Sequence, residues 1–393
     1  MIKVDYPGGL PEPDYKNFEW FYPKEPSRFN KNDLSDLLLY CSAIGSSDIT
    51  IQNESPIICH IHGKLFKVTK RVISKTEVSD WITFVHGNEG AIGILNSSKP
   101  IDASYEVKPD HQRGLRIRFR VNVTSALISG HRGYQITFRT IPDQPPLISE
   151  MNLPQDIIDN ICPKQGLILI TGATGSGKST LLSSIIRSIA ENPTAHKKIL
   201  TFEAPVEFVY DDINKPTCSI SQSEIGPGKS LETFADGVRN ALRRAPNIAL
   251  IGEMRDHETI SEGVILAMTG HLVYSTVHSN GFADTIRRMV NVFNADEKNA
   301  IAVDIINSLK MVITQLLVPS VDNKRVALRE YLIFNEEIVD RLLMTEVDKL
   351  IYTSREVLKQ YGQTFLQDAE KKFAEGVIDE KQLKEIRRIS VNK

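Results

Sequence analysis

The pattern of apolar and polar positions changes near residue 155. Before it, short segments of mostly alternating character predict strands in IICHIHGKLFKV, GLRIRFRVNVTSA and GYQITFRTI. From Asn32, NDLSDLLLYCSA predicts an amphipathic helix with a polar first residue, and a further helix is predicted around residues 75–87. This mixture predicts an α+β domain over residues 31–140.

Beyond residue 155, apolar runs alternate regularly with amphipathic stretches. The predicted strands are GLILITG, KKILTF, NIALIG and HLVYSTV. The predicted helices are KSTLLSSIIRSIAEN, a stretch around LETFADGVRNALRRA, and ETISEGVILAMTG. Strands that alternate with helices predict a parallel sheet with helices on both faces, so we expect an α/β domain over residues 155–345.

Three further segments flank these domains. Residues 1–30, rich in Pro, Asp and aromatic residues, predict an extended N-terminal arm, either packed on a neighbour or partly disordered. IPDQPPLISEMNLP, residues 141–154, contains four prolines and predicts a hinge linker. Residues 346–393 predict a charged helical tail, either a terminal part of the second domain or a pair of helices that binds a partner.

Composition narrows the class of protein. With 393 residues, 41% hydrophobic and 24% charged, the chain has the length and composition of a soluble protein of two or three domains. A net charge of −2 gives no general attraction to nucleic acid or anionic lipid. No apolar run approaches the roughly 18 residues of a membrane-spanning helix, and we expect neither a signal peptide nor a transmembrane segment. The four cysteines form no CxxC pair, which favours a reducing cytosol.

The strongest chemical motif is GATGSGKST, which matches the Walker A pattern G-x-x-x-x-G-K-[ST] between a predicted strand and a predicted helix. Its glycines allow backbone amides to surround phosphate at the positive end of the helix. Lys178 is expected to neutralise the β- and γ-phosphates of ATP, and the Ser179 hydroxyl to bind Mg²⁺. The predicted nucleotide-binding residues are Gly172, Ala173, Thr174, Gly175, Ser176, Gly177, Lys178, Ser179 and Thr180.

Polar residues also follow the other predicted strands. Glu253 ends NIALIGE, where P-loop proteins usually carry an acidic residue, and Glu203 and Glu207 lie in FEAPVEF. In a parallel sheet, these carboxylates fall at the strand ends where ligands bind. His271 and His278 lie at the two ends of one strand, and His278 is the better placed to polarise the γ-phosphate.

These motifs stand in the order found in the secretion ATPase superfamily of type II and type IV systems. They are SSDITI, RFRVN, FRTIP, the Walker A loop, FEAPVEF, GEMRD and TGHLVYSTVHS. Over residues 32 to about 345 the chain resembles this superfamily, and most closely its PilT-like branch. The resemblance implies a homohexameric ATPase motor that uses ATP and Mg²⁺, with a PAS-like N-terminal domain and a RecA-like C-terminal domain. It also implies a cytoplasmic protein that meets the inner membrane through platform and coupling proteins, without stable nucleic-acid binding.

The resemblance also suggests roles for matching residues. Glu253 matches the catalytic glutamate that activates water, and Glu203 the residue of the acidic box that holds Mg²⁺ through water. His278 matches the histidine nearest the nucleotide, with His271 as its companion. The arginines that reach phosphate in this family match Arg118, Arg120 and Arg139, with His131 and Arg132 as weaker candidates.

Three departures from the family pattern bear on the subtype. Ala204 replaces the aspartate of the usual Glu-Asp-Pro box, and no Cys₄ zinc element occurs. EEIVDRLLMTEVDKL stands where pilus-retraction members carry an AIRNLIR-like segment. The last two favour the DotB- and TraJ-like branch, which serves type IVB secretion or conjugation.

Other functions stay open at this point. A type IV pilus retraction ATPase belongs to the same superfamily. RecA-like sheets also drive nucleic-acid motors, for which GLRIRFRVN and LRRAP are the only basic stretches. Ala204 leaves open a scaffold that binds ATP without hydrolysing it, and a small-molecule kinase is a further alternative.

Overall fold

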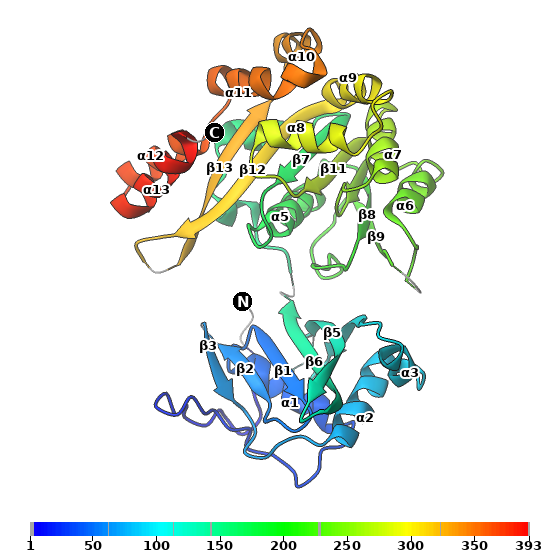
Figure 1. Cartoon of the computed structure of the whole chain (residues 1–393), viewed down its shortest axis with the longest axis vertical. Coiled ribbons are helices and arrows are strands. Elements are labelled where there is room, and N and C mark those ends of the chain that lie inside the picture. Colours follow the sequence, from blue (N-terminus) through cyan, green and yellow to red (C-terminus); the bar gives the residue numbers. More distant parts are fainter. Residues whose placement is uncertain are drawn as a thin grey trace. The chain divides into compact units, whose positions relative to one another are not determined.

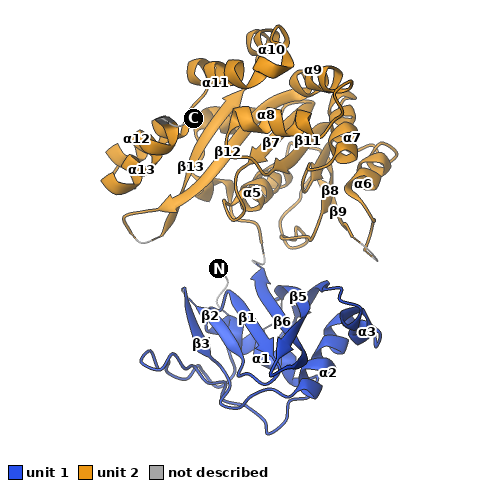
Figure 2. Ribbon diagram, viewed as in Figure 1, with its two compact units in different colours: residues 1–143 blue, residues 144–393 orange. Residues whose placement is uncertain are grey.

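The computed structural model divides into two compact units, residues 1–143 and 144–393 (Figure 2). The structure describes residues 4–61, 63–112, 114–141, 144–226, 229–322 and 324–391. Pro142 and Asp143 of the predicted hinge 141–154 therefore lie outside the described residues.

Unit 1 is built on an antiparallel sheet that has six strands among the described residues, in the order β3-β2-β1-β6-β5-β4. Its elements are α1 (Asp33–Ala43), β1 (Asp48–Gln52), β2 (Ile58–Ile61), β3 (Lys64–Lys67), α2 (Lys75–His86), α3 (Ala91–Asn96), β4 (Ile101–Val107), β5 (Ile117–Ile128) and β6 (His131–Ile141). The α+β prediction for this part of the chain is confirmed.

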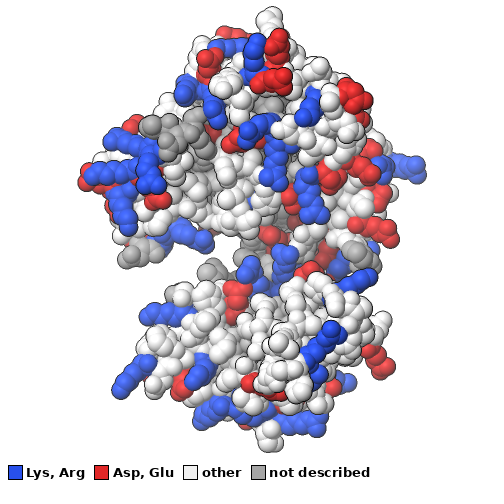
Figure 3. Space-filling model, viewed as in Figure 1, with Lys and Arg blue, Asp and Glu red and all other residues white. Residues whose placement is uncertain are grey.

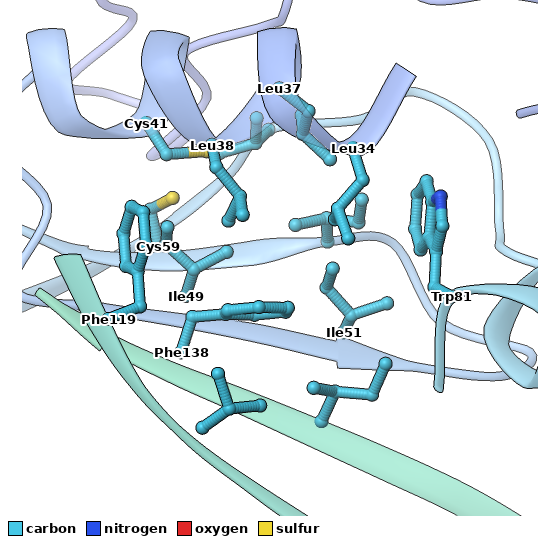
Figure 4. Packing of buried hydrophobic residues seen from close by; sticks show 14 of the residues in the cluster. Leu34, Leu37, Leu38, Cys41, Ile49, Ile51, Cys59, Trp81, Phe119 and Phe138 are labelled. Carbon is cyan, nitrogen blue, oxygen red and sulfur yellow. The ribbon is translucent and has the colours of Figure 1, made fainter. Parts of the chain in front are cut away.

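The core of unit 1 lies between helix α1 and one face of this sheet (Figure 4). Leu34 and Leu38 of α1 face Ile49 of β1 and Phe138 of β6, all of them buried. Because strand side chains alternate between faces, Phe119 of β5 is buried in this core while its neighbours in sequence lie on the other face. The opposite face of the sheet is therefore polar.

The N-terminal segment differs from the separate arm that the sequence suggests. Tyr6, Tyr22 and Phe29 are buried in the core of unit 1. The backbone N–H of Trp20 donates to the carbonyl of Lys67 at 2.9 Å, which extends the pairing at the β3 edge. The aromatic residues that gave this segment its unusual composition are therefore core residues of its own unit.

Unit 2 is built on a sheet whose described strands number seven, in the order β13-β12-β7-β11-β10-β8-β9 (Figure 1). The strands are β7 (Gly166–Thr171), β8 (Lys198–Glu203), β9 (Ser219–Glu224), β10 (Ile248–Ile251), β11 (Leu272–Val277), β12 (Leu309–Pro319) and β13 (Arg325–Ile333). All pairs are parallel except β12 with β13. The predicted α/β fold with a mainly parallel sheet is confirmed.

Helices cover both faces of this sheet, as the alternation along β7 shows. Ile168 and Ile170 belong to the cluster that includes α5 residues, while Leu167 and Leu169 belong to the cluster on the other face. Strands buried on both faces become continuous apolar runs, which is why GLILIT was recognisable in the sequence. The helices are η1 (Ile148–Met151), α4 (Gln155–Asn160), α5 (Lys178–Glu191), α6 (Phe234–Ala241), α7 (His257–Met268), α8 (Phe282–Asn291), α9 (Lys298–Ser308), α10 (Glu336–Leu343), η2 (Val347–Lys349), α11 (Leu350–Tyr361), α12 (Phe365–Ala374) and α13 (Glu380–Val391).

The C-terminal helices are part of unit 2. Val357 and Leu358 of α11 are buried in one of its main clusters. Ala369 of α12 and Leu383 of α13 pack with Leu328 of β13 in a smaller cluster. The tail is thus an element of the second domain, one of the two alternatives that the sequence left open. Within the described residues, every helix is too short or too polar to cross a bilayer.

Candidate active site

The carboxyl ends of four parallel strands lie side by side in unit 2. In the register of the sheet, Val277 of β11 is opposite Thr171 of β7, and Ile251 of β10 is opposite both Ser275 of β11 and Phe202 of β8. The segments that follow these strands therefore meet at one edge. They carry the phosphate loop, His278, Glu253 and the acidic box, which are far apart in the sequence.

At two positions of the phosphate loop, the backbone conformation and the close neighbours favour glycine over every other residue. Gly172 and Gly177 have φ of +144° and +83°. A Cβ on Gly172 would lie 2.4 Å from the carbonyl oxygen of Gln315, and one on Gly177 would lie 2.8 Å from Gln315 Nε2. The loop is thus packed tightly against β12, which fixes the path of its backbone.

The loop has the properties of an anion site. Gly177 is the N-cap of α5, and no described side chain caps this end of the helix. The first-turn N–H groups have no acceptor within the helix and lie at its positive end. Ser176 Oγ is buried and has no hydrogen-bond partner among the residues that the structure describes. These free donors fit the phosphates of a nucleotide.

Lys178 is the buried cation of the loop. Lys178 is only 8% exposed as a whole residue. Its Nζ donates to the carbonyl oxygens of Gly172 and Ala173 at 2.9 Å each. Burial lowers the pKa of Lys178, while the nearby carboxylates of Glu253 and Glu207 act against this shift. Neutral carbonyls do not balance the charge of this lysine, so an anionic phosphate is a more favourable partner.

His278 lies between Lys178 and Glu253. Its Nδ1 is 3.4 Å from Lys178 Nζ, and its Nε2 is 3.7 Å from Glu253 Oε1. Burial lowers the pKa of His278, the positive charges of Lys178 and Arg288 lower it as well, and Glu253 opposes them. The lowered pKa favours a neutral ring at pH 7. Such a ring accepts a hydrogen bond from the lysine at Nδ1 and directs its Nε2–H toward the carboxylate.

Backbone and side-chain hydrogen bonds hold the segment that carries Glu253. The Gly252 N–H donates to Phe202 O at 2.7 Å, and the Met254 N–H donates to Thr276 O at 3.0 Å. Thr276 Oγ1 donates to Gly252 O at 2.6 Å. The Glu253 side chain itself is 26% exposed. The structure thus combines a fixed backbone with a carboxylate that water can reach.

Glu203 has a different environment. It is only 8% exposed, and its Oε1 accepts hydrogen bonds from Thr201 Oγ1 at 2.6 Å and Gln222 Nε2 at 3.2 Å. Burial raises its pKa, and the charge of Glu207 raises it further, although the two hydrogen bonds lower it. Among the described residues, no cluster of three or more His, Cys, Asp or Glu side chains is suited to a metal. Ser179, with its hydroxyl in the first turn of α5, stays the predicted protein ligand for Mg²⁺, an ion that commonly keeps several waters.

Three further residues of this site belong to none of the sequence motifs. Thr201 and Gln222 hold Glu203, and Arg288 of α8 contributes positive charge near His278. The sequence does indicate that Thr201 lies beside Glu203, because residues two apart in a strand share a face. Nothing in the sequence indicates the contact of Gln222, since its strand, β9, is mostly polar.

The three predicted arginines lie together in unit 1, on the polar face of its sheet. Arg120 of β5 is directly opposite Arg139 of β6. Arg139 Nε donates to Asp48 Oδ1 at 2.7 Å, and Arg118 Nε is 3.8 Å from Glu106 Oε2. Arg118 Nη1 is buried and has no hydrogen-bond partner among the described residues. We call Arg118, Arg120 and Arg139 the arginine cluster.

The structure separates the remaining candidates from these groups. His271 precedes β11 and His278 follows it, so they lie about 20 Å apart at the strand's rise per residue. His271 Nδ1 contacts Leu266 O at 3.1 Å at the end of α7, and among the described residues no contact joins it to His278, so its match to the family's companion histidine stays a prediction. His131 and Arg132 begin β6, at the far end of that strand from the arginine cluster.

Comparison with known proteins gives consistent matches. The family model described as "Type II/IV secretion system protein" matches residues 146–388. A "Twitching motility protein" of Neisseria gonorrhoeae is 36% identical over 315 residues, which cover 79% of this chain and 79% of that protein. The crystal structure of the Legionella pneumophila ATPase DotB is 45% identical, covers 94% of this chain and 98% of its own, and superposes with a TM-score of 0.86. The crystal structure of the pilus retraction motor PilT with bound ADP is 29% identical. The match covers 90% of this chain and 96% of that chain, with a TM-score of 0.76.

Proposed function

This chain belongs to the family of type II/IV secretion system proteins, and we propose that it is an ATPase motor that powers a type IVB secretion or conjugation-like transfer apparatus. The observation that carries the proposal is the row of Lys178, His278 and Glu253 beside the phosphate loop. It supplies a phosphate cation, a neutral imidazole and a carboxylate from three adjacent strands. Phosphoryl transfer to water needs groups of these kinds.

In the proposed mechanism, the loop amides and Lys178 bind the phosphates of ATP. Lys178 exchanges its contacts with two loop carbonyls for phosphate oxygens. The Ser179 hydroxyl would hold Mg²⁺, which would supply positive charge against the phosphates of ATP. Glu253 accepts the proton of the attacking water, and His278 orients that water and the γ-phosphate. Glu203 orders water at the edge of this site.

We further propose that the chain acts as a homohexamer in which the arginine cluster contacts the nucleotide. Arg120 is exposed, and Arg118 Nη1 has no hydrogen-bond partner among the residues that the structure describes, so both arginines have donors that could meet an anion. Arginines that stabilise the charge of the transition state raise the rate of phosphoryl transfer strongly. Residues 141–154 are the proposed hinge that lets this contact change with the nucleotide.

The proposed location is the cytoplasmic side of the inner membrane, reached through platform and coupling proteins. The similarity to DotB, at 45% identity, supports the type IVB assignment over pilus retraction, since PilT with bound ADP is 29% identical. Pilus retraction is the second candidate, and the 36% identity to a twitching motility protein favours it. Deleting the gene separates the two functions, because it abolishes either substrate transfer or pilus retraction.

A nucleic-acid motor is the less favoured alternative. On the face drawn in Figure 3, basic side chains are interspersed with acidic ones over unit 2. A protein that tracks nucleic acid usually presents basic groups along one groove or face. ATPase activity stimulated by single-stranded nucleic acid at low salt would favour this alternative.

Phosphate release from ATP by the purified full-length chain tests the proposal. We expect turnover that requires Mg²⁺ and that stops in Lys178→Ala. If the chain binds ATP in the presence of Mg²⁺ but releases no phosphate, it is the non-hydrolysing scaffold instead. Molar mass measured in solution with nucleotide tests the hexamer independently.

A further inference from the structure

Two buried polar residues of the β12–β13 hairpin, Gln315 and Arg329, connect the phosphate loop with the start of unit 2. They are 5% and 4% exposed. Gln315 Nε2 donates to the carbonyl oxygen of Ser176 in the phosphate loop at 2.7 Å. Arg329 Nε donates to Gln315 Oε1 at 3.0 Å.

The contact with Arg329 fixes the orientation of the Gln315 amide. An amide has one acceptor oxygen and one donor nitrogen. Because the guanidinium occupies the oxygen, the nitrogen must face the loop, where it donates to Ser176. The Gln315 backbone contacts the same loop, since its carbonyl oxygen lies where a Cβ on Gly172 would be.

The other end of Arg329 holds the segment that leads into unit 2. Its Nη2 donates to Met151 O at 2.7 Å and its Nη1 to Asn152 O at 3.1 Å. Met151 belongs to η1, and Asn152 follows it with a φ of +47°. One guanidinium thus spans the distance between the glutamine that supports the phosphate loop and the carbonyls of this entry segment, residues 144–154.

A second arginine holds the same segment from the helix that follows the loop. Arg187 of α5 donates from Nη1 to Pro145 O at 2.5 Å. Ile148 and Met151 also pack against the apolar cluster that contains Leu182 and Ile185 of α5. The entry segment therefore contacts both the helix that begins at the phosphate loop and the hairpin that supports that loop.

Arg329 is a costly residue for a purely structural role. Its three side-chain hydrogen bonds go to neutral oxygens, and burial lowers its pKa to about 10, although Asp368 acts against this. Asp368 accepts a hydrogen bond from the backbone N–H of Arg329 at 2.7 Å, but among the described residues no carboxylate forms an ion pair with the guanidinium. A buried charge without a direct ion pair costs free energy, and an apolar side chain of similar volume often serves packing better. An apolar residue cannot replace the planar guanidinium, which donates to three acceptors at fixed angles.

We propose that Gln315 and Arg329 are positioning residues that couple the phosphate loop to the entry segment of unit 2. When phosphate binds and the Ser176 carbonyl adjusts, Gln315 and then Arg329 follow, and the Met151 and Asn152 carbonyls respond. The inference rests on the proposed function, because it requires that the loop bind nucleotide. It adds a route, inside unit 2, from the nucleotide to the segment that joins unit 1 along the chain.

The test uses full-length protein with Gln315→Met, which keeps the volume, and Arg329→Lys, which keeps the charge but loses the fork. Arg325→Lys, an exposed arginine on the same strand, is the matched control. We expect both variants to bind a fluorescent ADP analogue about 3- to 10-fold more weakly than wild type, the range for one or two lost hydrogen bonds, and the control to be unchanged. In hydrogen exchange, ADP should protect residues 147–153 in wild type. In Gln315→Met at saturating ADP, this protection should disappear while the phosphate loop stays protected.

Wild-type affinity and wild-type protection of residues 147–153 in Gln315→Met would overturn the inference. So would an equal loss of protection throughout unit 2, because that result indicates a role in stability alone. If the wild-type chain fails to bind ADP, the proposed function fails and this inference with it. If wild type binds ADP and the variants match the Arg325→Lys control, only the inference fails.

Discussion

The imidazole of His278 contacts Glu253 and Lys178 through its two different nitrogens. Nε2 lies 3.7 Å from the Glu253 carboxylate, and Nδ1 lies 3.4 Å from the Lys178 ammonium. The ring therefore links the buried cation of the phosphate loop with the proposed base for water. Its lowered pKa keeps it neutral, so that each nitrogen has a distinct role as acceptor or donor.

Replacing Lys178 with alanine should weaken nucleotide binding. The variant loses the ammonium that pairs with phosphate, so we expect the Kd for ADP to rise about 10- to 100-fold. Calorimetric titration measures this directly. Lys359→Ala, an exposed lysine on α11, is the control. Equal affinities for the two variants would contradict the assignment of the loop.

The activity of the wild-type chain should fall at acid pH because of His278. Burial and Lys178 lower its pKa below the usual 6.5, so the ring stays neutral at pH 7 and gains a proton only as pH falls through that lowered value. His278→Gln should reduce kcat about 100-fold and remove this dependence from the pH–rate profile. His271→Gln, at the other end of β11, should behave as wild type. The assignment fails if the two variants have the same kcat.

The same pKa shift has a consequence for stability. Below pH 6.5 the unfolded chain binds a proton at this histidine more strongly than the folded chain does. The contribution of His278 to the free energy of unfolding therefore decreases as pH falls from about 6.5 through the lowered pKa. His278→Gln should show a smaller loss of thermal stability between pH 7 and pH 5 than wild type.

Glu203 should make the opposite contribution. Its pKa is raised by burial, so its neutral form is compatible with the fold and stability is lost as pH rises from about 4.5 through the raised pKa. Glu203→Gln keeps an acceptor for Thr201 without a buried charge. We expect its Tm without nucleotide to exceed that of wild type by about 2–4 °C at pH 8, which corresponds to about 1 kcal/mol, and to match it at pH 4. Glu232→Gln, at an exposed position, is the control. A lower Tm for Glu203→Gln at pH 8 would show that the ionised carboxylate stabilises the fold.

Arg120→Ala tests the arginine cluster. Arg120 is exposed, so its removal should leave the fold and the Kd for ADP unchanged. If the cluster stabilises the transition state in the assembled protein, kcat should fall at least about 10-fold. Arg132→Ala, at the other end of β6, provides the comparison. Equal turnover by the two variants would remove Arg120 from the mechanism.

The sequence was sufficient for the parts of the fold that depend on local pattern. β7, β8, β10 and β11 are buried on both faces and therefore appear as apolar runs. The Walker A pattern depends on glycines and a lysine at fixed spacing, so it too could be recognised. By contrast, β9 has the polar sequence SISQSE, which contains no apolar run that predicts a strand. The N-terminal aromatic residues predict an arm when read locally, because the core that they fill is formed by distant residues.

Much of the candidate site could not be predicted, because its contacts join residues far apart in the chain. Gln222 is 19 positions from Glu203, and Gln315 is 139 positions from Ser176. Neither glutamine belongs to a local motif. His271 and His278 are an example of what the sequence does predict, because the strand pattern of HLVYSTV already places them at opposite ends of β11.

Glu253→Gln in the full-length chain tests the central claim most directly. The amide keeps the shape of the side chain but cannot accept a proton from water. The measurement is the rate of phosphate release at saturating Mg·ATP together with the Kd for ADP, with Glu258→Gln on the exposed part of α7 as the control. We predict that turnover falls at least about 100-fold while the Kd changes less than about 3-fold. Turnover by Glu253→Gln at the rate of wild type would contradict the account.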